Sequence, residues 1–229
     1  GVLITAWVTD LLVRQYLPRM TVARLHLDVS PDLRVLGFSL LMAALTAGRA
    51  GRDVILADED FRMGGRLNSE THGIDDQPGA DWAAEAVAEL ASLHNVRLMP
   101  RTTVIGAFDH GIYGAVERIS DHLFRPDAGK PRQVLWRIYT GQTILCAGAT
   151  ERPIAFDNND RPGILLGSAI RTYVNRFAAT PARRVTLFTN NDDGHRTARD
   201  LQAKGIHICA VVDVRPDAPR SLDFEVLRG

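Results

Sequence analysis

The sequence predicts an α/β fold, and two features of its apolar pattern predict it. Segments typical of a strand, a helix and a second strand follow one another in RVLGFSLLMAALTAGRAGRDVILADED (34–60). The same succession returns in VTLFTNNDDGHRTARDLQAKGIHICAVVD (185–213). Because strands that alternate with helices form parallel sheets covered by helices, we expect a three-layer, Rossmann-like fold of the kind that binds FAD or NAD(P), with a small antiparallel β insert.

The first half of the chain contains the elements of the first predicted unit. A strand is expected at LRVLGF (33–38), followed by a helix of small and apolar residues, SLLMAALTAGRAG (39–51), that ends at glycine. DVILAD (53–58) has the continuous apolar pattern of a buried strand. ADWAAEAVAELASL (80–93) carries an apolar stripe at helical spacing, and VRLMP (96–100) is a short strand.

The antiparallel insert is predicted by three segments of strand-like composition. They are TTVIGAFD (102–109), IYGAVERI (112–119) and QVLWRIYT (133–140), separated by the loops DHG and FRPDAGKPR. A further apolar segment, TILCAGA (143–149), is typical of a buried strand. Asp109 and His110 begin the DHG loop, where a hairpin turn is favoured over a functional dyad.

These elements divide the chain into three parts. Residues 1–33 form a leader with no assigned role, and its apolar start, residues 1–20, is too short and too charged to span a bilayer. Residues 34–181 form the dinucleotide-binding domain, with the β insert at about 102–140, and residues 182–229 form the start of a second, truncated Rossmann-like unit. We interpret the sequence as a piece of a longer protein.

Composition and motifs exclude several classes of function. The formal net charge is zero, so no overall field favours nucleic acid or an anionic membrane, and we expect a cytoplasmic protein. Cys146 and Cys209 lie far apart, which excludes a CxxC redox pair. The histidines show no metal-ligand spacing, and the chain has no GxSxG nucleophile elbow. We therefore predict no metal site and no catalytic residue.

The glycine-rich turn of a dinucleotide site is almost absent. Such a turn needs three glycines after the first strand: for the tight turn, for the approach to the pyrophosphate, and for close packing of helix and strand. The three positions fall at Val35, Gly37 and Leu40, and only the middle one is glycine. Val35 disfavours a positive φ, and Leu40 places a large side chain where close packing is expected.

Other parts of such a site are present. Asp58 ends the second strand, 21 residues after Gly37, where an acid accepts hydrogen bonds from a ribose 2′-hydroxyl. Because its carboxylate repels a 2′-phosphate, NAD or FAD fits better than NADP. The loop RMGGRL (62–67) supplies two glycines and two arginines for the approach to a diphosphate. Taken one at a time, Asp58 is also explained as a solvated acid and the glycine pair as an ordinary turn. Found together at this spacing, they favour descent from a nucleotide-binding domain.

The late unit is predicted to keep the architecture without the ligand. Its three glycine positions fall at Thr189, Asn191 and Gly194, and Asp213 ends the next strand 19 residues after Gly194. Two carboxylates, Asp192–Asp193, begin its helix, where they favour the helix dipole but oppose a second anion. We expect this unit to pack structurally and to bind no dinucleotide.

Several long phrases between about Asp53 and Pro216 resemble the alpha subunit of heterotetrameric sarcosine oxidases, which in turn resemble two-dinucleotide-domain flavoproteins. They include VILADEDFRMGGRLNSE, FDHGIYGAVERISDHL, GATERPIAFDNNDRPGI and VTLFTNNDDGHRTARDLQAKG, in the same order. The resemblance implies NAD in the alpha subunit, FAD in a beta subunit, FMN between them, and oxidative demethylation of sarcosine by the whole complex. Residues 1–33 and the glycine turn depart from the family, and the folate-binding region is missing.

Carried over residue by residue, the resemblance implies a cofactor site and other subunits as partners. Thr103 and Val104 match the stretch that borders the adenine, and Gly148 and Ala149 match a second glycine-containing approach to the nucleotide. The predicted cofactor-binding residues are Gly37, Asp58, Glu59, Gly64, Gly65, Arg66, Thr103, Val104, Gly148 and Ala149.

Several functions stay open at this point. The chain is the nucleotide-binding part of a sarcosine-oxidase-like alpha subunit, not active alone, or it is a degenerate scaffold that binds no cofactor. A subunit of a related opine or amino-acid dehydrogenase flavoprotein is a further alternative. Val35 and Leu40 are the residues that favour the scaffold.

Overall fold

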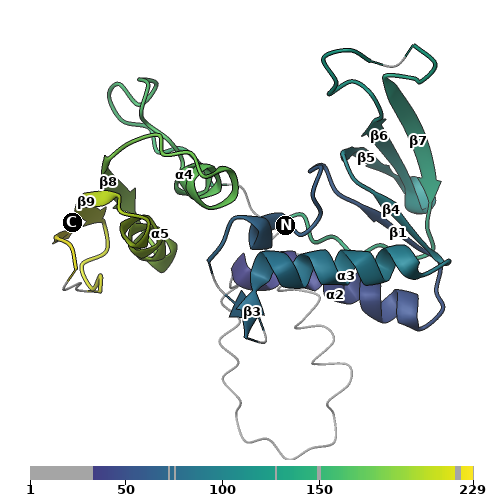
Figure 1. Cartoon of the computed structure of the whole chain (residues 1–229), viewed down its shortest axis with the longest axis horizontal. Helices are drawn as coiled ribbons and strands as arrows, with labels where there is room; N and C mark the ends of the chain where they lie inside the picture. Colours follow the sequence, from purple (N-terminus) through teal and green to yellow (C-terminus); the bar gives the residue numbers. More distant parts are fainter. Residues whose placement is uncertain are drawn as a thin grey trace, which may run out of the picture. The chain divides into compact units, whose positions relative to one another are not determined.

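The computed structural model describes residues 33–71, 73–74, 76–126, 128–148, 151–219 and 223–228 (Figure 1). Of the predicted leader, residues 1–32 lie outside this part of the chain. The described residues form two compact units. The first unit contains residues 33–67 and 80–148, and the second contains 68–79 and those from 151 onward.

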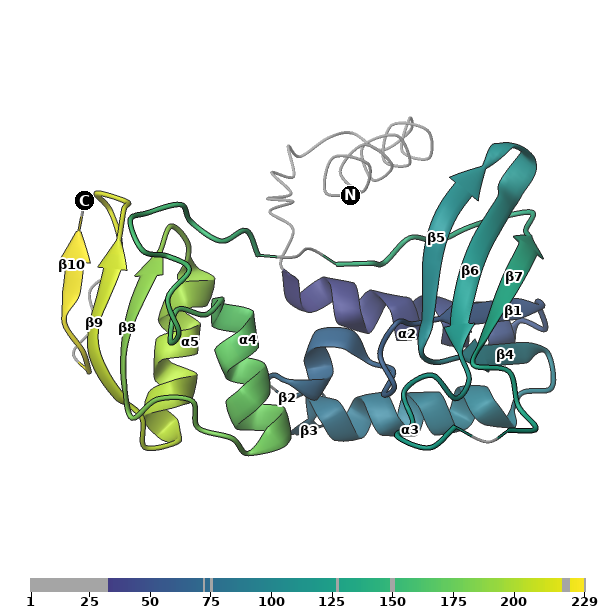
Figure 2. The same ribbon diagram turned by 90° about the horizontal axis from the view of Figure 1, so that it is seen from above.

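Two helices and a two-stranded parallel sheet form the base of the first unit. The strands β1 (Val54–Ala57) and β4 (Val96–Met99) pair in register from Val54 opposite Val96 to Ala57 opposite Met99. The helices α2 (Leu33–Arg49) and α3 (Gly79–Ser92) lie side by side (Figures 1 and 2). The short 3₁₀ helix η1 (Gly65–Asn68) follows the loop after β1.

The two helices pack closely because small residues lie where they meet their neighbours. A Cβ atom on Gly48 would lie 2.9 Å from Val96 and 3.0 Å from Leu93. Arg49 closes the contact on the solvent side with two hydrogen bonds to the Glu89 carboxylate, of 2.6 and 2.7 Å. The buried hydrophobic residues of α3 are Ala83, Ala86 and Leu90.

The predicted strand at 33–38 is wrong, because α2 begins at Leu33 and runs through it. Val35 and Leu40 stand where the glycine pattern requires glycine. No glycine at these two positions therefore interrupts the helix. The predicted strand TILCAGA also fails in its described residues 143–148, which belong to no strand. A strand needs a hydrogen-bonded neighbour; here Ile144 and Leu145 are 64% and 68% exposed.

The three predicted antiparallel strands are present as one sheet, in the order β5–β6–β7. A bulge interrupts the pairing of β5 and β6 between Val104 and Gly106. Asp109 and His110 lie in the turn between β5 and β6, within the short helix η2 (Asp109–Gly111), as the hairpin interpretation predicted. The strands are β5 (Thr102–Phe108), β6 (Ile112–Arg118) and β7 (Gln133–Tyr139).

The second unit is built on a parallel sheet with strand order β10–β9–β8. The predicted strand–helix–strand succession is present as β8, α5 and β9, and β10 adds a strand that the sequence pattern did not predict. The hairpin β2–β3 and the adjoining helices α4 and η3 precede β8 in the chain. The elements are β2 (Gly73–Ile74), β3 (Gln77–Pro78), α4 (Gly167–Arg171), η3 (Thr172–Arg176), β8 (Arg184–Thr189), α5 (Asp192–Ala203), β9 (His207–Asp213) and β10 (Val226–Arg228).

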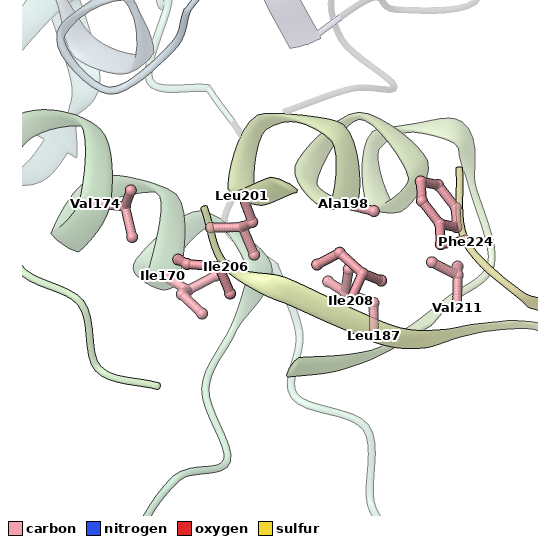
Figure 3. Close-up of a cluster of buried hydrophobic side chains, with 9 residues drawn as sticks. All are labelled: Ile170, Val174, Leu187, Ala198, Leu201, Ile206, Ile208, Val211 and Phe224. Carbon is pink, nitrogen blue, oxygen red and sulfur yellow. The ribbon is translucent and has the colours of Figure 1, made fainter. Parts of the chain in front are cut away.

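The core of the second unit lies between its helices and its sheet (Figure 3). Leu201 of α5 and Val211 of β9 are 1% and 0% exposed. Burying such side chains supplies the apolar contribution to the stability of this unit. The cluster contains Ile170, Val174, Leu187, Ala198, Leu201, Ile206, Ile208, Val211 and Phe224.

Candidate functional site

The candidate site lies at the carboxyl ends of β1 and β4, where ligands of parallel α/β sheets bind. Asp58 directly follows β1 and is half-buried. Its side-chain Oδ1 accepts a hydrogen bond of 3.0 Å from the backbone N–H of Asp60, and the backbone of Gly64 donates to the same carboxylate. The loop from Asp58 to Gly64 therefore folds back around the acid.

Burial is the dominant influence on the Asp58 carboxyl and raises its pKa above the usual value. The backbone hydrogen bonds from Asp60 and Gly64 oppose this increase. A partly desolvated carboxylate gains more from a new hydrogen-bond donor than one in bulk water, because the local dielectric is lower. The Asp58 carboxylate is therefore suited to accept hydrogen bonds from the hydroxyls of a ligand.

The backbone of this loop is held on the connection between β4 and β5. Asp58 donates its N–H to the carbonyl of Met99 at 3.1 Å, and its own carbonyl accepts from the N–H of Thr102 at 2.8 Å. The Asp60 carbonyl accepts from the N–H of Arg101 at 2.9 Å. Since Thr103 and Val104 follow on β5, the structure brings the start of β5 to the Asp58 loop.

A long-range contact that the sequence analysis missed also holds the loop. Arg118, at the end of β6, donates a hydrogen bond of 2.8 Å from Nη2 to the carbonyl of Glu59. Arg101 lies with its guanidinium 5.2 Å from the ring centre of Phe61 in the same loop. These residues are 59 and 40 positions away from their partners, so no local motif identifies them.

The glycine pair of the loop takes the backbone conformation that favours glycine. Gly64 has a φ of 125° and Gly65 a φ of 52°, and Gly64 is buried. Arg66 follows in η1 and is half-buried. Asp58, Glu59, the glycine pair and Arg66 therefore belong to one compact turn.

Gly37 and Gly148, two further predicted site residues, are not part of this turn. Gly37 lies inside α2, so the prediction that it forms a turn after a strand is wrong. Gly148 has a φ of 69° in an extended, exposed segment, with no atom within 4 Å of an added Cβ. Ala149 lies outside the described residues.

In the second unit, the glycine pattern is confirmed at its third position. A Cβ atom on Gly194 would overlap the Oγ1 and Cβ atoms of Thr189, so only glycine allows α5 to approach β8 this closely. The helix is capped by Asn191, whose side chain accepts a hydrogen bond of 3.0 Å from the N–H of Asp193. Close packing and capping account for both residues.

The acid of the second unit is bound by its own chain. Asp213 is fully buried and contacts the Nε2 of His195 at 2.7 Å and the Nη2 of Arg215 at 2.8 Å. The hydrogen bonds from Arg215, followed by that from His195, hold the pKa of Asp213 well below its usual range. This arrangement agrees with the expectation of a unit without a dinucleotide, which stays a prediction.

A second buried network contains Arg171, which the sequence analysis did not identify. Its side chain is 2% exposed and lies 3.2 Å from Asp193, 3.2 Å from Asp200 and 3.7 Å from Glu70. Thr71 donates a hydrogen bond of 2.8 Å to Asp200. This network joins the segment 68–71 to α4 and α5 within the second unit.

Two features are absent from the residues that the structure describes. No helix in them is long and apolar enough to cross a membrane. In the same part of the chain, no group of three or more His, Cys, Asp or Glu side chains is arranged to hold a metal ion.

No protein-family model matches the chain. Among curated proteins, it is 46% identical over 189 residues to the sarcosine oxidase subunit alpha of Rhizobium meliloti, which covers 82% of this chain and 19% of the relative. It is 40% and 37% identical to the sarcosine oxidase subunits alpha of Corynebacterium sp. strains P-1 and U-96, each over 83% of this chain and 20% of the relative. The chain thus spans about a fifth of these relatives' length.

A solved structure supports the α/β fold. The L-proline dehydrogenase of P. horikoshii superposes with a TM-score of 0.61 at 18% identity, covering 83% of this chain and 40% of that chain. At this identity the similarity shows the fold alone. The sequence identities go further, because three relatives with the same name match across the same large share of the chain. The chain belongs to the sarcosine oxidase alpha-subunit family, of which it spans about a fifth of the length.

Proposed function

We propose that the first unit binds the adenosine half of a dinucleotide, NAD or FAD, as part of a sarcosine-oxidase-like alpha subunit. The observation that carries this proposal is the turn around Asp58. A half-buried carboxylate at the carboxyl end of a parallel strand is followed by two glycines with positive φ. In dinucleotide sites, such an acid accepts hydrogen bonds from the ribose hydroxyls.

The chemistry of the turn favours a ribose with free hydroxyls. The Asp58 carboxylate attracts the 2′-hydroxyl and repels a 2′-phosphate, so NAD is preferred to NADP. FAD carries the same adenosine half and satisfies Asp58 in the same way. Gly65 is exposed and leaves its backbone accessible to a diphosphate, and Arg66 follows it in η1 with a positive charge.

The chain's own residues would bind and orient the nucleotide and would not perform the oxidation. Sarcosine demethylation, with its flavins and its further subunits, would belong to the assembled enzyme. The unit would hold the adenosine through Asp58 and the start of β5, with Thr103 and Val104 near the adenine.

The test is a binding measurement on the purified chain. Any nucleotide released on denaturation is identified by chromatography and absorbance, and NAD, FAD and NADP are then titrated by calorimetry. We expect NAD or FAD to bind, and Asp58→Asn to weaken binding by about tenfold, as for loss of one hydrogen bond to a charged group. Asp53→Asn is the matched control, because Asp53 is an exposed acid just before the other end of the same strand.

A degenerate scaffold is the second candidate function, and one observation favours it. The helix α2 occupies the residues expected to form the first strand and its glycine turn. If the purified chain contains no nucleotide and binds neither NAD nor FAD, the scaffold is the correct description.

A further inference from the structure

The sheet β5–β6–β7 has one face that is apolar and open to solvent. Four of its large side chains are strongly exposed: Ile105 by 61%, Phe108 by 63%, Leu135 by 72% and Tyr139 by 66%. Exposed apolar groups that gather on one surface, unlike scattered ones, mark sites of protein association.

The strand register places these side chains on the same face. Phe108 is opposite Ile112, which is opposite Tyr139, and Val116 is opposite Leu135. Neighbouring residues on paired strands point to the same side of a sheet. We call this surface the outer face; its residues are Thr103, Ile105, Gly106, Phe108, Ile112, Gly114, Val116, Arg118, Gln133, Leu135, Arg137 and Tyr139.

The opposite side of the sheet packs within the first unit. Val134, Trp136 and Ile138 alternate with the exposed residues of β7 and are half-buried. Trp136 stacks under the guanidinium of Arg97 on β4 at 4.2 Å, and Ala115 is fully buried. The sheet therefore already uses one face for its own unit.

Two paired glycines shape the middle of the outer face. Gly106 is opposite Gly114, and the ring of Phe108 lies over both, 2.9 Å from a Cβ added to Gly106 and 3.4 Å from one added to Gly114. The side chain of Ile105 lies 3.5 Å from the latter position. The distal edge of the Phe108 ring therefore lies over two paired residues that have no side chains.

The charges of the outer face are all positive. Arg137 is exposed opposite Gly114 and has no hydrogen-bond or ion-pair partner among the described residues. Arg118, at the edge of the face, is already bound to the carbonyl of Glu59. No aspartate or glutamate is part of the face. Two copies meeting through this face would bring like charges into an apolar contact, which is costly.

We propose that the outer face is the docking surface for a different subunit of the oxidase, which presents apolar side chains and a carboxylate that pairs with Arg137. This inference rests on the proposed function, since it takes the chain to work inside a multi-subunit enzyme, as the name "subunit alpha" of its relatives indicates. The apolar contact supplies affinity, and the desolvated Arg137–carboxylate pair fixes the partner's position.

The experiment measures binding of the purified chain to the non-alpha subunits of the Rhizobium meliloti sarcosine oxidase by biolayer interferometry. The test variants are Leu135→Glu and Arg137→Glu. We expect each to weaken binding by at least about tenfold, because a charge is buried or reversed opposite its partner. Leu227→Glu and Arg199→Glu are matched controls in the second unit, where both residues are exposed, and they should bind as the wild-type chain does.

Three outcomes overturn the inference. The first is equal binding by the wild-type chain and both outer-face variants, or no binding by the wild-type chain. The second is a concentration-dependent dimer in analytical ultracentrifugation that Leu135→Glu abolishes, which would assign the face to a second copy. The third is binding to the remainder of the alpha polypeptide, supplied separately, in place of the other subunits.

Nucleotide titrations of the same preparations keep the two proposals apart. A chain that docks through the outer face but binds neither NAD nor FAD contradicts only the nucleotide site. A chain that binds a dinucleotide while Leu135→Glu and Arg137→Glu leave docking unchanged contradicts only the docking surface.

Discussion

The Nε2 atom of His195 lies 2.7 Å from Oδ2 of Asp213, and both side chains are buried. Asp213 ends β9 at the place where a dinucleotide-binding unit presents an acid to a ribose. Arg215 contacts both carboxylate oxygens and also reaches Asp192 at 2.7 Å. A ribose hydroxyl would have to displace one of these groups, so the acid acts within the unit itself.

The ion pairs of Asp213 predict a loss of stability in acid. Arg215 holds the pKa of this carboxyl well below its usual value of 3.8. A carboxyl with a lowered folded-state pKa stabilises the fold fully above its unfolded pKa, and the contribution is lost as the pH falls from there toward the folded pKa. We expect the melting temperature to fall below about pH 4. Asp213→Asn should melt lower at pH 7 and depend less on pH in this acid range.

Scanning calorimetry between pH 7 and pH 3 checks this expectation. Asp217→Asn, which changes an exposed acid close to the same strand, should keep the wild-type profile. If the melting temperatures of Asp213→Asn and the wild-type chain fall in parallel as the pH is lowered, the ion pairs of Asp213 do not cause the loss of stability in acid.

The contact between α5 and β8 predicts a specific cost for a single methyl group. Gly194→Ala places its Cβ against the side chain of Thr189 and forces the helix and strand apart. We expect the free energy of unfolding to fall by about 1–3 kcal/mol, as for other overpacked interiors. Gly141→Ala is the control, since no atom lies within 4 Å of its added Cβ, and it should change stability by less than about 0.5 kcal/mol. Urea unfolding of both variants measures the difference, and equal midpoints would contradict the prediction.

Local sequence signals predicted most elements, and the failures have a common physical origin. The helix expected at 80–93 is found at Gly79–Ser92, because its apolar stripe and its alanines specify a helix without outside help. TILCAGA has an equally clear strand pattern, but a strand also depends on a neighbour. Residues 143–148 pair with no strand among the described residues, so their apolar pattern alone did not make them a strand.

The candidate site shows the same limit at the level of single residues. Asp58 and the Gly64–Gly65 pair follow β1 at short spacing, so a sequence pattern identifies them. Arg118 reaches Glu59 from another sheet, and His195 reaches Asp213 from α5. Such contacts depend on tertiary packing, which the periodicity of the sequence does not predict. The arginine two residues after a strand-end acid is the one signal that points to the Asp213 network.

The raised pKa of Asp58 predicts how nucleotide binding depends on pH. Binding through this residue requires the ionised carboxylate, and burial makes that form harder to reach. As the pH falls, protonation should begin above the usual value of 3.8 and weaken NAD or FAD binding earlier than for an exposed aspartate. Calorimetric titrations from pH 7 to pH 4 measure the midpoint. In Asp58→Asn, the remaining nucleotide affinity should no longer depend on pH in this range. If its pH profile matches that of the wild-type chain, another group causes the pH dependence.

The hydrogen bond from Arg118 to Glu59 predicts an effect on binding that is distinct from stability. Without it, the loop that presents Asp58 loses one of its contacts with the sheet. A net contribution of about 1 kcal/mol corresponds to about fivefold weaker dinucleotide binding in Arg118→Gln. Arg118→Lys keeps one donor and should recover part of the affinity, and Arg137→Gln on the neighbouring strand should have no effect. Affinities by calorimetry and melting temperatures of all three variants separate a positioning role from a general loss of stability.

The helix α2 predicts the outcome of restoring the missing glycines. In a strand and turn, Val35→Gly with Leu40→Gly would repair the phosphate-binding turn and raise NAD or FAD affinity. In the helix that runs from Leu33 to Arg49, each glycine costs about 1 kcal/mol relative to alanine and opens no site. We therefore expect less helical circular dichroism, a lower melting temperature and no gain in affinity. The double variant Val35→Ala with Leu40→Ala keeps the helix. It removes the same side chains as the glycine pair apart from one methyl group at each position, so comparing the two variants isolates the effect of glycine. A rise in affinity for the glycine pair alone would mean that this segment can adopt the strand and turn when a nucleotide is present.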